Sequence, residues 1–187
     1  MAPNILAHAF ALLLAMPLLA AAQGLPAEWE VRDLALALGK QMDLLVPALA
    51  RFDTAHWTGA PAAYAEQRDL ASHEAAYAAD AAREVAEKPL GLGKAFELHL
   101  RIQAVESLVN SLSLGARTYQ PGTPVDEPLE ILGAAASQHS KLRDYIMELA
   151  TSKDQELSRI DAEAQRCRSE MLRAPAPTKP TKAKASK

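Results

Sequence analysis

A run of large apolar residues near the middle of the chain constrains the fold more than any other feature. It contains five residues at intervals of four, three, four and three: Leu98, Ile102, Val105, Val109 and Leu112. This spacing places them on one face of an α-helix, and no proline interrupts residues 94–115. We expect the face to be widened by three further leucines, Leu100, Leu108 and Leu114. A face this broad exceeds what one partner helix covers, so other helices must wrap around it.

The composition favours helices throughout the chain. Apolar residues make up 49% of the sequence but aromatic residues only 5%, because alanine and leucine dominate. Both residues stabilise helices, whereas the β-branched and aromatic runs typical of strands are scarce. We therefore predict an all-α protein.

Proline and glycine clusters divide the apolar pattern into four helical segments. The breaks fall near residues 53–61, 88–93 and 120–124. The second segment is rich in alanine, which permits close approach but buries little area per side chain. Short connections make neighbouring helices antiparallel, so we predict an up-and-down four-helix bundle. Its expected helices are 27–52, 62–87, 94–118 and 127–171.

The fourth predicted helix is longer than the other three. At 1.5 Å per residue it spans about 65 Å, whereas the others are nearer 40 Å. Its last third has no part of its own chain to pack against. It either breaks near Thr151 and folds back onto the bundle or continues as a solvated arm.

The first residues resemble an export signal. An apolar stretch from Ile5 to Leu19 ends in three alanines, a small-residue cleavage pattern. We interpret residues 1–22 as a signal peptide that is cleaved after Ala22; the alternative is an uncleaved N-terminal anchor. No later apolar run approaches membrane-spanning length. We expect a periplasmic or secreted protein without a transmembrane segment in the mature chain.

Charge separates the end of the chain from its body. The formal net charge is −3, yet residues 173–187 contain five basic residues and no acidic one, so the remainder carries −8. Prolines among alanine and lysine predict a disordered basic tail at 173–187 after a bundle domain at 23–172. An acidic body lacks the basic face that nucleic-acid binding requires, so no nucleic-acid partner is expected.

Four histidines follow the predicted signal: His56, His73, His99 and His139. Metal sites in helix bundles use a glutamate three residues before a histidine, and none of the four has one. His139 lies in the apolar stripe of the fourth helix and should point inward. We interpret it as a buried neutral histidine that bonds to the third helix through Gln103, Glu106 or Asn110. The alternative is a metal or small-ligand site formed by His139 with His99.

No pattern in the chain indicates catalysis. Gly-x-Ser-x-Gly, His-Glu-x-x-His, a phosphate-binding glycine loop and the haem motif Cys-x-x-Cys-His are all missing from the sequence. The lone cysteine, Cys167, lies 28 residues after His139, which is about 42 Å along one helix. We therefore expect no catalytic residue, no metal ligand set and no cofactor.

The end of the fourth helix has the spacing of a coiled coil. Its apolar residues, which we call the seam, are Leu157, Ile160, Ala164, Cys167 and Met171. Steps of three and four residues between charged neighbours are typical of paired helices. A leftover cysteine in an exported chain suggests a disulfide between chains. We hypothesise a homodimer through residues 153–172, in which a parallel arrangement brings Cys167 against its counterpart.

Together these features predict an exported, non-enzymatic helical bundle that binds a protein partner or the cell envelope. The other hypothesis is a bundle that binds a metal or small ligand through His139 and His99.

Overall fold

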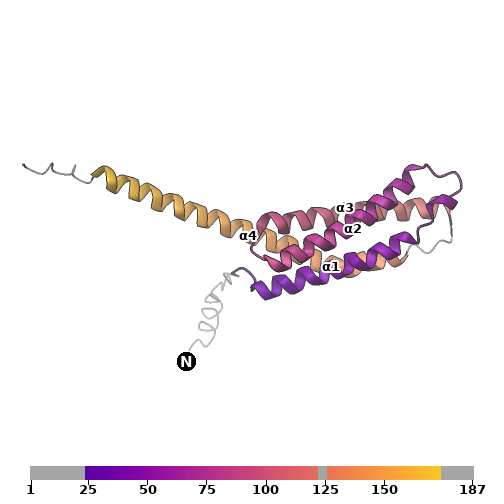
Figure 1. Cartoon of the computed structure of the whole chain (residues 1–187), viewed down its shortest axis with the longest axis horizontal. Helices are drawn as coiled ribbons and strands as arrows, with labels where there is room; N and C mark the ends of the chain where they lie inside the picture. The colour runs from indigo at the N-terminus through magenta and orange to yellow at the C-terminus, as the bar shows by residue number, and fades with distance from the viewer. Residues whose placement is uncertain (1–23, 122–125, 174–187) are drawn as a thin grey trace, which may run out of the picture.

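The computed structural model describes residues 24–121 and 126–173. The predicted signal at 1–22 and the tail from residue 174 onward lie outside the described residues. The described helices are α1 (Glu28–Ala50), the short η1 (Thr54–His56), α2 (Ala63–Glu87), α3 (Leu92–Tyr119) and α4 (Asp126–Arg173). Helices α1 to α4 form an all-α four-helix bundle, which confirms the predicted fold class (Figure 1). Each predicted helix end lies within two residues of the observed one.

The four long helices pack at the corners of a square. Helix α1 packs against α2 and α4, and α3 packs against the same two helices. Successive helices run in opposite directions, so the bundle is up-and-down (Figure 1). As predicted, more than one helix covers the apolar face of α3, since α2 and α4 both pack against it, whereas its opposite face is open to solvent.

The core of α3 follows the predicted stripe. The five residues spaced at three and four, from Leu98 to Leu112, are fully buried. The proposed widening was wrong for two leucines: Leu100 is 49% exposed and Leu114 is 67% exposed. Each lies two residues after a core position, and two residues are about 200° around a helix. They therefore face solvent on the far side of α3.

Small residues bring α1 and α2 together. An added Cβ atom at Gly39 of α1 would lie 3.1 Å from the Cβ atom of Ala82 in α2. Seven of the eight buried residues of α2 are alanines. The short side chains thus let the two backbones approach closely, as the alanine-rich sequence predicted.

Aromatic rings close the end of the bundle that carries the α1–α2 connection. The Trp57 side chain is buried, and its ring centroid lies 6.3 Å from that of Phe52 and 5.2 Å from that of Tyr64. Tyr64 in turn packs edge-on against Tyr119 at the end of α3. Gly115 leaves the space that these rings occupy, since its added Cβ atom would lie 2.5 Å from Cε1 of Tyr64.

Helix α4 is continuous over 48 residues and leaves the bundle (Figure 1). Its buried residues end at Leu149. The helix neither breaks at Thr151 nor folds back, so residues 151–173 form a straight extension, which we call the arm. None of the described helices is both long and apolar enough to cross a membrane.

Candidate functional site

His139 lies at the centre of a hydrogen-bonded chain between α3 and α4. It occupies a core position of α4, between Ala135 and Leu142, and its side chain is buried as predicted. Its Nδ1 atom lies 2.9 Å from Oε1 of Glu106, and its Nε2 atom lies 2.8 Å from Nδ1 of His99. Both ring nitrogens of His139 therefore have partners. The sequence left three residues of the third helix as possible partners of His139, and in the structure the partner among them is Glu106.

Helical spacing brings the α3 partners to one face. His99, Gln103 and Glu106 are four and three residues apart, so their side chains leave α3 in similar directions. His139 and Arg143 have the same relation on α4. This spacing was visible in the sequence, but it did not show that the two faces meet.

The hydrogen-bond geometry restricts the protons on the two rings. A carboxylate only accepts hydrogen bonds, so Nδ1 of His139 carries a proton toward Glu106. One proton then lies between Nε2 of His139 and Nδ1 of His99. If it resides on His99, both rings are neutral; if it resides on His139, that ring is an imidazolium between a carboxylate and a neutral imidazole. The second state contains one proton more than the first, because a neutral His99 that accepts at Nδ1 carries its own proton on Nε2.

Several charges act on His99. Burial lowers its pKa below 6.5, and the positive charges of His139 and Arg143 act in the same direction. The carboxylate of Glu106 opposes them. Burial has the largest effect, so the net change in the pKa of His99 is downward.

An open cavity of about 250 Å³ borders this chain of side chains. Its polar lining residues are His99, Gln103, Glu106, His139, Ser140 and Arg143. A small polar molecule or anion entering it would meet the Arg143 guanidinium and the His99 ring. The site can therefore donate hydrogen bonds and hold a proton.

The other histidines do not join this site. His56 bonds to Asp53 in the α1–α2 connection, 2.5 Å from Nδ1 to Oδ2, and His73 is exposed on α2. Within residues 24–121 and 126–173, no three His, Cys, Asp or Glu side chains are grouped to hold a metal ion. His99 and Glu106 contact different ring nitrogens of His139, so these three side chains do not converge on one point.

Cys167 lies far from the histidines. It is a free, exposed cysteine on the arm, and α4 is unbroken between it and His139. The two residues are therefore about 42 Å apart along the helix.

A larger cavity between α1 and α4 was not anticipated from the sequence. It has a volume of about 480 Å³ and combines apolar Val31 and Leu34 with charged Lys141 and Glu148. The buried Oε1 atom of Gln138, which also lines this cavity, has no hydrogen-bond partner within the described residues.

Comparisons with known proteins supply no family. No protein-family model matches the chain, and searches of curated proteins and of solved structures find no match.

Proposed function

We propose that this chain is an exported, non-enzymatic helical-bundle protein that binds a protein partner or the cell envelope through its arm. The observation that carries the proposal is the exposed seam. Leu157 is 60% exposed, Ile160 is 50% exposed and Met171 is 70% exposed, although they repeat at the spacing of a helix interface. None of the other described helices covers them. A continuous apolar stripe on an otherwise charged helix indicates a surface that is buried by association.

The basic residues 173–187 support the envelope as one destination. Each lysine near an anionic surface contributes on the order of 1 kcal/mol, an attraction that salt screens. Release of the protein from native membranes by high salt would assign this part of the binding to the tail. Retention in high salt would assign it to the apolar seam.

A charge placed in the seam tests the proposal. Full-length Ile160→Asp, immobilised and incubated with a solubilised native envelope fraction, should lose the partners that the wild-type chain retains. The matched control is Ser158→Asp, which adds the same charge to the same part of the arm but about 160° away around the helix. Equal retention by the wild-type chain and both variants would contradict binding through the arm.

A second candidate function is binding of a metal or small ligand at His139 and His99. The contact between these two rings favours it, because a carboxylate behind a histidine is the usual support of a metal-ligating imidazole. A metal ion would have to replace the hydrogen bond between the rings and find further ligands. Metal analysis and an absorption spectrum of natively purified protein test this function. A stoichiometric metal or a Soret band would favour it over the first proposal.

A further inference from the structure

We propose that the arm binds a second copy of this chain in the antiparallel direction, centred on residue 162. The inference rests on the proposed function, since it names the partner of the same seam. It follows from the direction in which the seam faces, from the sizes of its residues and from the charges beside it.

The seam continues the core-facing side of α4. Steps of three and four residues lead from Ile146 and Leu149, which are buried, through Lys153 to Leu157. Residues in an α-helix are about 100° apart, so this spacing keeps one direction along the helix. A helix that covers the seam therefore lies on the side of α4 where the rest of the bundle lies.

This direction opposes a parallel dimer. In a parallel pair, the α4 helix of the second copy would continue from the arm into the space that α1, α2 and α3 occupy beside the first α4 (Figure 1). In an antiparallel pair, the second helix ends where the first bundle begins, and the second bundle lies beyond the tip of the first arm. The two arms then overlap over their whole length.

The sizes of the seam residues suit the antiparallel register centred on residue 162. It places Leu157 opposite Cys167 of the second copy and Ile160 opposite Ala164 of the second copy. Each large side chain thus meets a small one, which fills an interface evenly. Parallel pairing would instead place each residue against its own counterpart, leaving a gap at Ala164.

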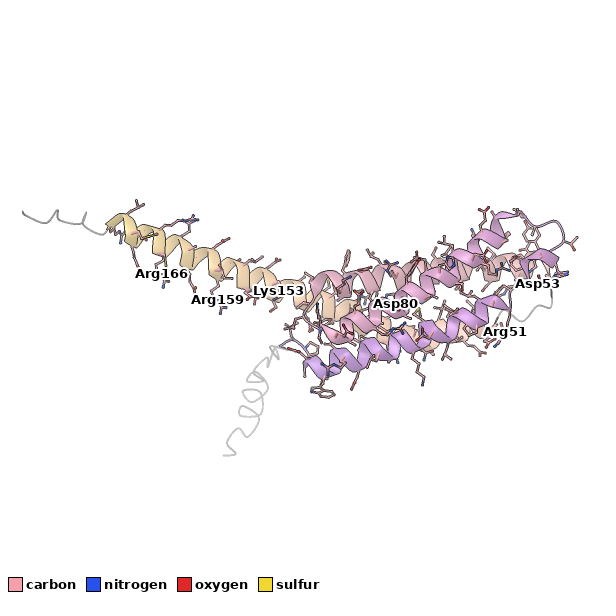
Figure 2. The ribbon with its side chains drawn as sticks, in the orientation of Figure 1. Arg51, Asp53, Asp80, Lys153, Arg159 and Arg166 are labelled. Atoms are coloured by element: carbon pink, nitrogen blue, oxygen red, sulfur yellow. The ribbon has the colours of Figure 1, made fainter. Side chains whose placement is uncertain are left out.

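Charges along the arm also favour opposite directions. Residues 151–161 contain two basic and three acidic residues, a net charge of −1, and residues 163–173 contain three basic and two acidic residues, a net charge of +1. Antiparallel arms place each half against its opposite. Glu163 approaches its counterpart near the centre, and spacings of four and three residues place Arg159 and Arg166 one turn to either side on the same flank. Figure 2 shows these two arginines along the arm. These guanidinium groups offset the repulsion between the carboxylates.

Engineered disulfides distinguish the two directions. Under mild oxidation, full-length Leu157→Cys should form a covalent dimer on a non-reducing gel, and peptide mapping should find residue 157 linked to Cys167. Within one helix these positions are about 15 Å apart, too far for a disulfide. The control Leu157→Cys with Cys167→Ser should stay uncrosslinked, because antiparallel arms also separate the two copies of residue 157.

Sedimentation equilibrium tests the association itself. The wild-type chain and Ser158→Asp should have twice the monomer mass, and Ile160→Asp should have the monomer mass with an unchanged far-ultraviolet spectrum. A monomeric wild-type chain at tens of micromolar would overturn the proposal. A Cys167–Cys167 crosslink in the wild-type chain, as efficient as the crosslink in Leu157→Cys, would also overturn it, in favour of a parallel pair.

The same variants separate this inference from the function on which it rests. If the wild-type chain is monomeric but Ile160→Asp still loses an envelope partner, the arm binds a different molecule and only the dimer is refuted. If Ile160→Asp changes neither association nor envelope retention, both proposals fail.

Discussion

At the scale of single residues, two positions in α3 show how one side chain depends on its neighbours across the bundle. Gly115 has no side chain where the Trp57 and Tyr64 rings pack against α3. Partial burial, together with the nearby His139, lowers the pKa of His99. The space at Gly115 leads to a prediction about the stability of the fold, and the pKa of His99 leads to predictions about its pH dependence.

Replacing Gly115 with alanine should destabilise the protein. Alanine favours a helix by about 1 kcal/mol over glycine, but its Cβ atom would lie 2.5 Å from Tyr64 and 2.9 Å from Trp57. Both rings belong to a packed aromatic group, so overpacking of about 1–3 kcal/mol should exceed the gain. Gly133→Ala is the control, because an added Cβ atom there meets nothing within 4 Å. Urea unfolding should show a loss for Gly115→Ala and a gain of about 0.5–1 kcal/mol for Gly133→Ala.

The titration of His99 should weaken the fold in mild acid. Its folded-state pKa lies below the ordinary value of 6.5, so the unfolded chain binds more protons as the pH falls. The contribution of His99 to stability is therefore complete above pH 6.5 and declines below it. Thermal unfolding at a series of pH values should show this decline, and His99→Gln should flatten it.

Two neighbours should move that pKa in opposite directions. Because Arg143 lowers the pKa of His99 and Glu106 raises it, Arg143→Gln should raise it and Glu106→Gln should lower it further. Proton NMR of the imidazole ring follows both changes. A His99 pKa at or above 6.5 in the wild-type chain would contradict the arrangement.

At the scale of the elements, α4 is one helix with two environments. Up to Leu149 its apolar face is covered by α1 and α3, whereas the same face of the arm is open to solvent. An isolated helix of about twenty residues is marginally stable in water. The arm therefore depends on its own helix propensity and on the bundle helix that it continues.

Hydrogen exchange should report this division. Amides at residues 142–149 should exchange slowly at any protein concentration, because they are released only when the bundle opens. Amides at residues 157–167 should become better protected as the concentration rises, since the proposed second copy would cover them. Leu142→Ala, which should cost about 2–5 kcal/mol in the buried core, should accelerate the first group without removing the concentration dependence of the second. Slow exchange throughout the arm at low concentration would contradict this account.

At the scale of the whole molecule, the proposed location depends on residues that precede the bundle. Export with cleavage after Ala22 should produce a mature chain that begins at Gln23, and intact-mass analysis of the protein recovered from the producing cells measures this directly. A mature species that retains residues 1–22 would refute the signal interpretation.

The sequence by itself determined the helices and most of the core. Helix ends depend on prolines, glycines and the loss of apolar spacing, all of which are local, so each end was predicted within two residues. Periodicity likewise predicted that His139 and the stripe from Leu98 to Leu112 would face inward. Leu100 and Leu114 were misplaced because nearness along the chain was taken for a shared face, although residues two apart on a helix point in opposite directions.

Only the tertiary structure decided which faces meet. The spacing of residues along α3 and α4 does not determine how each helix is rotated about its own axis in the bundle. The rotation found in the structure places His99 in contact with His139. The tertiary structure also decided that α4 continues past the bundle and leaves its seam open to solvent, which local propensity does not determine. Contacts between distant segments depend on the packing of all four helices at once, because each helix buries its stripe only where a neighbour provides the complementary surface.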